Sequence, residues 1–260
     1  MPNANDEDVL QSTRRLGQQI GHNYIDVIVD QCGLDYSVIP ALSGFSPEIK
    51  WLSLYKGLPE DIYPEDAPLL VRVMFDDLQQ WNWLQALAKE MSSTAPLLVL
   101  CSSWSFSQLG KWLTEIVNAR QEGREGIFRF WDTRIFSYLF TDILSAEQQE
   151  QLKRPVICWG WQDRDGHSVW LTGRGNIPQR EEVAKQLDFS DSQYEKFMCL
   201  CDAKRFVAQR LLAENTFTTK EAELRACFEG MVNATLAGVL FDDERDAWVL
   251  NYATQLGSQT

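Results

Sequence analysis

The sequence has only two histidines, His22 and His167, among its 260 residues. Serine and cysteine nucleophiles usually depend on a histidine base, so this scarcity disfavours hydrolases of that kind. A P-loop, a His-Glu-x-x-His pair, a Gly-x-Ser-x-Gly elbow and a Cys-x-x-Cys pair are also missing. We therefore predict no catalytic residue, no metal site and no cofactor, and we expect that the chain is not an enzyme.

Positive charge is scarce as well, because 24 Lys and Arg stand against 37 Asp and Glu, which gives a net charge of -13. Nucleic acids and anionic membranes attract clustered basic residues, so neither is an expected partner. No apolar run approaches the ~20 residues of a membrane span. The first eight residues lack the basic and apolar regions of a signal peptide. We expect a cytoplasmic protein whose acidic surface suits a basic or neutral protein partner.

Cysteine is scattered rather than paired, and a chain of this length does not need disulfides to fold. Cys199 and Cys201 lie two positions apart on a predicted helix, roughly 200° apart around its axis, so they cannot share a metal ion. We expect free thiols at all six positions, namely Cys32, Cys101, Cys158, Cys199, Cys201 and Cys227.

Hydrophobic residues, by contrast, make up 45% of the chain and aromatic residues 12%, which is ample for a core. Up to residue 173, segments with the periodicity of strands alternate with segments typical of helices. This alternation predicts an α/β fold class with a mixed sheet and a hairpin at one edge. The expected strands are 24–30, 51–55, 69–74, 96–101, 127–131, 156–161 and 168–171. The expected helices are 9–20, 78–91, 105–119 and 132–144.

The segment from Gly173 to Pro178 is rich in glycine and reads as a linker. Beyond it the pattern is helical. Ser190 with Gln193, and Thr218 with Glu221, are spaced as capping boxes, and Asp242 or Asp243 can start a last helix. The predicted domains are an α/β lobe at 1–173, a linker at 174–187 and a smaller all-helical lobe at 188–260.

A cluster of charged and aromatic residues lies between the predicted strand 127–131 and the helix that follows. Arg129 and Trp131 would share one face of the strand. Asp132 is placed to cap the helix, and its carboxylate can pair with Arg129 or Arg134. The cluster is either an ion-paired corner that fixes the sheet or a surface that presents arginine and tryptophan to a partner.

Trp159 and Trp161 lie two apart on a predicted strand, so they share a face. They either pack in the core or form an exposed aromatic patch, and tryptophan is enriched at binding surfaces. The neighbouring segment from Asp163 to Gly166 resembles part of a calcium loop, but it lacks the completing glutamate and is read as a hairpin turn.

The segment from Ile127 to Ile135 resembles the signature Arg-[Phe/Tyr]-[Tyr/Trp]-Asp-Pro-Arg-Val of a family first catalogued as a domain of unknown function. Members of this family serve as adaptors, or effector chaperones, of type VI secretion. Two departures from its pattern are Thr133, where proline is usual, and Gln31-Cys32, where Gly-Ala is usual. Further similar features follow in the family's order, at Ile28–Asp30, Leu54–Glu60 and Ala67–Val71.

The resemblance implies a protein that binds a type VI effector, at the N-terminal region of that effector, and helps join it to a VgrG spike protein. It makes Asp30, Arg129, Trp131, Asp132 and Arg134 the signature residues. Two alternatives stay open. One is an immunity protein that neutralises a toxin, and the other is a small-molecule enzyme that uses the polar residues of the α/β lobe.

Overall fold

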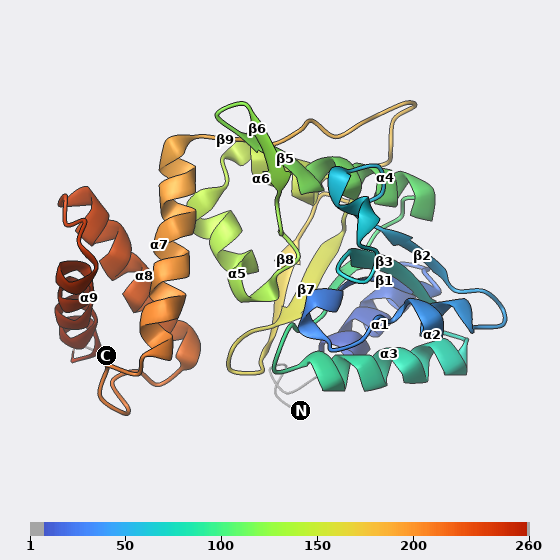
Figure 1. The fold of residues 1–260 in the computed structure, drawn as a ribbon. Helices are drawn as coiled ribbons and strands as arrows, with labels where there is room; N and C mark the ends of the chain where they lie inside the picture. Colours follow the sequence, from blue (N-terminus) through green and yellow to red (C-terminus); the bar gives the residue numbers. More distant parts are fainter. Residues whose placement is uncertain (1–7, 259–260) are drawn as a thin grey trace. The chain divides into compact units, whose positions relative to one another are not determined.

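The computed structural model describes residues 8–258, and the chain divides into two compact units after Asp188. The first unit combines a sheet with helices and the second is helical (Figure 1), so the predicted fold class is confirmed. Residues 174–187 belong to the first unit. There Arg174 N–H donates to the carbonyl of Lys153 at 2.8 Å, and Asn176 N–H donates to that of Arg154 at 3.1 Å. That this segment acts as a linker stays a prediction.

The main sheet of the described chain has six strands, and all of its pairings are antiparallel. A mixed sheet was expected, because strands that alternate with helices usually form parallel pairs. Here the crossover through helix α3 (Leu78–Met91) joins two strands on either side of β1, so they are parallel without being neighbours. The order is β2 (Lys50–Ser53), β3 (Pro68–Met74), β1 (Tyr24–Asp30), β4 (Leu98–Cys101), β7 (Cys158–Gln162) and β8 (Ser168–Thr172).

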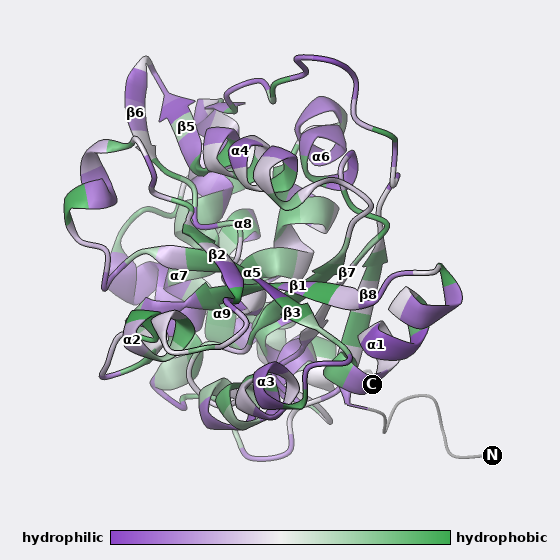
Figure 2. Cartoon of the chain, turned by 90° about the vertical axis from the view of Figure 1, so that its right-hand side faces the viewer, coloured by the Kyte–Doolittle hydropathy of each residue, from purple (hydrophilic) through white to green (hydrophobic). Residues whose placement is uncertain are grey.

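Helices cover both faces of this sheet (Figure 1). On one face, α1 (Val9–Gln19) meets α3, where the guanidinium of Arg14 lies 4.6 Å from the ring centre of Trp81. On the other face, α4 (Phe106–Val117) approaches β2 closely, because a Cβ at Gly110 would collide with the side chain of Leu52. Buried apolar residues are concentrated on the strands of this sheet. Much of the ribbon of β7 and β8 is coloured as hydrophobic in Figure 2.

A small hairpin that the sequence reading missed follows α4. Its strands, β5 (Asn118–Gln121) and β6 (Arg124–Ile127), are joined by Glu122 and Gly123 at φ 50° and 77°, as a two-residue type I′ turn requires. The hairpin is largely hydrophilic (Figure 2), and β9 (Asp188–Phe189) lies on the other side of β5. The strand predicted at 127–131 was wrong, because β6 ends where that strand was expected to begin.

The remaining short elements of the first unit lie between the strands. The helix predicted at 132–144 is α5 (Thr133–Tyr138) followed by one π-helical turn, η3 (Leu139–Ile143). Helix α6 (Ala146–Lys153), capped by Ser145 and Gln148, was not predicted. The others are η1 (Gln31–Gly33), α2 (Ile39–Ser43) and η2 (Pro59–Ile62).

The second unit is formed by α7 (Asp191–Ala208), α8 (Lys220–Leu236) and α9 (Asp242–Gly257). The capping box of Ser190 and Gln193 is confirmed. The cap of α8 is Thr219 rather than Thr218, and its side chain accepts from the N–H of Ala222 at 3.1 Å. Among residues 8–258, no helix combines the length and apolar character that crossing a membrane requires.

An ion pair lies inside the first unit, between β1 and β3. Asp26 is 0% exposed and Arg72 is 7% exposed, and the two face each other in the ladder. The guanidinium donates from Nε and Nη2 to the two carboxylate oxygens at 2.7 and 2.8 Å. Nη2 also donates to the carbonyl of Trp104, and the ring of Tyr24 lies 3.8 Å from the guanidinium carbon. The buried charges are therefore paired and hydrogen-bonded, as burial requires.

We expect Asp26→Asn to lower the free energy of unfolding by roughly 3–5 kcal/mol, because it leaves the buried guanidinium of Arg72 without a counter-charge. The double variant Asp26→Leu with Arg72→Met removes both charges, and we expect it to be more stable than Asp26→Asn alone. Denaturant unfolding followed by tryptophan fluorescence measures both. A double variant no more stable than the single one would contradict this account.

Candidate functional site

An ion pair joins the end of β1 to the segment after β6. Asp30 ends β1 and is 7% exposed, and Arg129 lies 99 residues further along the chain. Nη2 of Arg129 donates to Oδ2 of Asp30 at 2.7 Å, and the guanidinium carbon lies 5.6 Å from the ring centre of Trp131. Burial is the largest single influence on Arg129 and lowers its pKa, but Asp30, Cys32 and Tyr55 together outweigh burial, so the pKa of Arg129 is raised. Arg129 therefore stays charged, with 39% of its side chain exposed.

A second ion pair is formed where α5 begins. Oδ1 of Asp132 accepts from the backbone N–H of Arg134 at 3.0 Å, so it caps the helix, and from Nε of the same residue at 2.7 Å. Oδ2 accepts from Nη2 at 2.9 Å. The hydrogen bond to Asp132 is the main cause that raises the pKa of Arg134. Of the two partners that the sequence left open for Asp132, the structure selects Arg134, while Arg129 pairs with Asp30.

Both arginines line one open hollow of about 410 Å³, which we call the arginine hollow. Three segments meet there: the end of β1 with η1, the loop between α3 and β4, and the corner that carries the two arginines. Its other walls are small or polar rather than aromatic. The lining residues are Asp30, Cys32, Gly33, Ser93, Thr94, Ala95, Arg129 and Arg134.

The loop residues of the hollow were missed by the sequence reading. Arg134 Nη1 donates to the carbonyl of Thr94 at 3.2 Å, which ties the corner to the loop. Gly33 approaches so closely that a Cβ there would lie 2.5 Å from the Cβ of Ala95. These loop residues belong to no recognisable motif. The one feature of the sequence that could have indicated a close approach of another segment is Gly33, three residues after the end of β1.

The two departures from the family signature have clear structural roles. Thr133 donates from its hydroxyl to the carbonyl of Pro96 at 3.2 Å, a bond that proline could not make. Gln31 is 2% exposed. Its amide donates to the carbonyls of Pro64 and Ala67, each at 2.9 Å, and its oxygen accepts from the backbone N–H of Val38 at 3.0 Å. Thr133 therefore holds the loop before β4 to the corner, and Gln31 holds two neighbouring loops to the end of β1.

The three tryptophans of the predicted site are buried and cannot form an exposed surface. Trp131, Trp159 and Trp161 are 2%, 0% and 4% exposed. The ring of Phe136 in α5 packs against Trp159 and Trp161, with ring centroids 5.5 and 4.9 Å apart, respectively. Of the two alternatives that the sequence left open for Trp159 and Trp161, the structure selects packing in the core, because α5 covers this face of β7. Of the predicted corner, the arginines rather than the tryptophan are presented at the surface.

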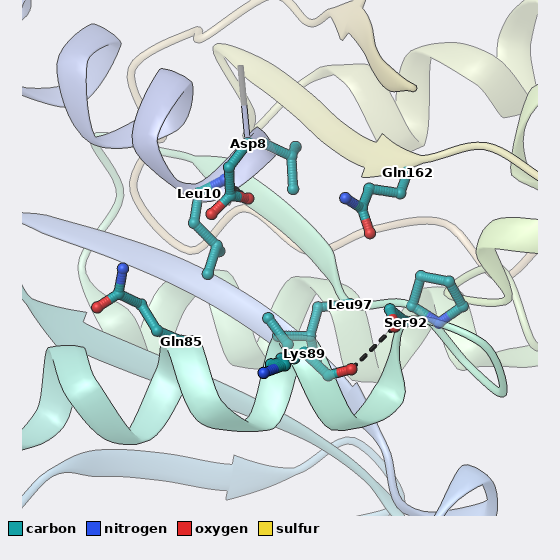
Figure 3. A pocket seen from close by; sticks show the side chains of 10 residues that line it. Asp8, Leu10, Gln85, Lys89, Ser92, Leu97 and Gln162 are labelled. Atoms are coloured by element: carbon teal, nitrogen blue, oxygen red, sulfur yellow. Dashed lines mark hydrogen bonds between the residues drawn. The ribbon is translucent and has the colours of Figure 1, made fainter. Parts of the chain in front are cut away.

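A smaller hollow of about 250 Å³ lies between the start of α1 and the end of α3 (Figure 3). Its polar groups serve the local helices. Asp8 accepts from the N–H of Leu10 at 3.1 Å, and Ser92 donates to the carbonyl of Lys89 at 2.8 Å, the dashed line in Figure 3. Its charged lining residues are Asp8, which caps α1, and Lys89 of α3.

The β7–β8 turn brings Asp163, Asp165 and His167 within 4.8 Å of one another, which is close enough to consider a metal ion. However, Oδ1 of Asp163 accepts from the backbone N–H of Asp165 at 2.9 Å and of His167 at 2.8 Å. This carboxylate closes the hairpin turn, in keeping with the turn read from the sequence.

Replacing Asp132 separates its two roles. We expect Asp132→Ala to lower the free energy of unfolding by about 1–2 kcal/mol, because both the helix cap and the ion pair are lost. Asp132→Asn should cost less, because asparagine also caps helices and the pair with the half-exposed Arg134 contributes little. Chemical denaturation of the two variants tests this, and equal losses would rule out the capping role.

Residues 27–151 match the model of a family described as a domain of unknown function (DUF4123). The match runs from β1 to α6 and includes Asp30, Arg129, Asp132 and Arg134. Neither the curated proteins nor the solved structures gave a match to this chain. The part of the chain that carries the arginine hollow is therefore similar to the DUF4123 family.

Proposed function

We propose that this protein is a non-enzymatic, cytoplasmic adaptor that binds a type VI secretion effector and helps load it onto a VgrG spike protein. The observation that carries the proposal is the match of residues 27–151 to the DUF4123 family. The chain resembles this family in its signature of arginine and aspartate residues. Members of the family act as effector adaptors or chaperones. The signature arginines line an open hollow, where a protein partner can reach them.

The chemistry of the hollow favours binding over catalysis. Asp30 and Asp132 are both engaged in ion pairs, so neither is set up as a free acid or base. Burial is the main cause that raises the pKa of nearby Tyr55 to about 12, so its hydroxyl stays neutral at physiological pH. Small-molecule sites are mostly enclosed and apolar, whereas this hollow is open and lined by small and polar groups.

Co-purification with separate effector fragments tests the proposal. We expect the chain to capture the N-terminal fragment of its effector, and to leave the toxic activity of the full effector unchanged. The captured complex should then bind the C-terminal part of VgrG, whereas the effector alone should bind it less well. The fragment that carries the toxic domain is the matched control.

Each alternative function predicts a different result in the same experiment. Capture of the toxic domain alone, with loss of its activity, would identify an immunity protein. An enzyme would capture neither fragment, and replacing Asp132 would abolish a turnover that the wild-type chain shows. Either result would refute the adaptor.

A further inference from the structure

The arginine hollow holds two guanidinium groups whose orientation is fixed from the protein side. Asp30 holds Arg129 at 2.7 Å, and Asp132 holds Arg134 through two bonds of 2.7 and 2.9 Å. A guanidinium has five N–H donors, and these inner bonds use only part of each set. Nη1 of Arg129 also donates to Sγ of Cys32 at 3.8 Å, and Nη1 of Arg134 donates to the carbonyl of Thr94 at 3.2 Å. The two side chains are 39% and 42% exposed, so their remaining N–H donors can reach a ligand.

The two arginines are also close enough to repel each other. The positive charge of Arg129 acts to lower the pKa of Arg134, although the bond to Asp132 raises it overall. An anion placed between the two groups would relieve this repulsion. The four charges of the corner balance, with two carboxylates and two guanidiniums, so a singly charged anion fits better than a doubly charged phosphate.

We propose that the arginine hollow binds the carboxylate of an aspartate or glutamate side chain of the effector. This inference rests on the proposed function and deepens it by naming the chemistry of the contact. Arginine recognises carboxylates through parallel N–H bonds, and a pre-oriented guanidinium loses less entropy on binding. The small walls formed by Gly33 and Ala95 admit the tip of a side chain, whereas a free metabolite would need more enclosure.

The arginine hollow is a local site where this acidic chain can bind an acidic group. With a net charge of -13, the protein repels acidic partners at most of its surface. The hollow places two half-exposed positive charges together, while the matching carboxylates lie behind them, 8% and 11% exposed. The contact would therefore set the register of the effector more than it would add overall attraction.

Ser93 lines the hollow and is exposed, so it offers a test that leaves all four charges in place. Ser93→Glu puts a competing carboxylate beside the arginines, and Ser93→Gln adds nearly the same volume without the charge. We expect the first variant to bind the effector N-terminal fragment about tenfold or more weakly, and the second to bind it nearly as the wild type does. Calorimetry gives the affinities, and thermal unfolding checks that both variants fold.

Substitutions in the effector fragment provide a second, independent test. Each acidic residue of the captured fragment is changed to its amide, and one change should weaken binding to the wild-type chain as much as Ser93→Glu does. Combined with Ser93→Glu, that change should weaken binding no further. If no amide substitution matters, or if Ser93→Glu and Ser93→Gln bind alike, the inference is wrong while the adaptor function stands.

Two further outcomes separate the remaining possibilities. If the wild-type chain captures no effector fragment, the proposed function fails, and the inference fails with it. Free acetate, glutamate and citrate serve as probes of a small-molecule site. Micromolar binding of one of them, lost in Ser93→Glu and kept in Ser93→Gln, would identify a metabolite site and overturn the inference.

Discussion

The buried carboxylate of Asp30 is the constraint on which the corner depends. A charge at the inner end of a strand costs several kcal/mol unless it is paired, so the chain must bring a cation to it. Arg129 supplies that cation and draws the segment after β6 back to the end of β1. Once Arg129 is in place, Phe130 and Trp131 enter the core, and Asp132 stands where α5 must begin.

The same face of β1 carries a second buried charge. Asp26 and Asp30 lie four residues apart on one strand, so both point to the side covered by α4 and α5. Each has an arginine partner, Arg72 on the neighbouring strand and Arg129 on the returning segment. Ion pairs demand defined geometry, whereas apolar contacts tolerate small shifts. This face of the sheet, and with it the guanidinium of Arg129, is therefore held in one arrangement.

The regular elements could largely be predicted from the sequence, and the exceptions have physical causes. Helical periodicity located α1 and α3 because each buries one face, whereas short runs of apolar and β-branched residues located β1 and β3, which are buried on both faces. The segment 127–131 was assigned to a strand because aromatic residues favour strands, yet Phe130 and Trp131 owe their burial to packing and not to a ladder. Helix α6 was missed because its eight residues include a single leucine and no broad apolar stripe.

The site was predictable only in part, and for a similar reason. Adjacent residues reveal local chemistry, so the cap and the pair of Asp132 with Arg134 could be anticipated. The pairing of Asp30 with Arg129 depends on tertiary folding across 99 residues, and nothing local to either residue indicates it. The loop Ser93–Ala95 lines the hollow because of the path of its main chain. The side chains of these residues do not indicate that path, so the sequence could not place the loop there.

The 99 residues between Asp30 and Arg129 also affect how the chain folds during its synthesis. A ribosome adds about 5–20 residues each second, so roughly 5–20 seconds pass between the synthesis of Asp30 and that of Arg129. Until then, the carboxylate lacks its partner, and β1 also waits for β3 and β4 to emerge. The nascent chain must therefore keep an incomplete sheet from aggregating, and the corner cannot close until Arg129 has been made.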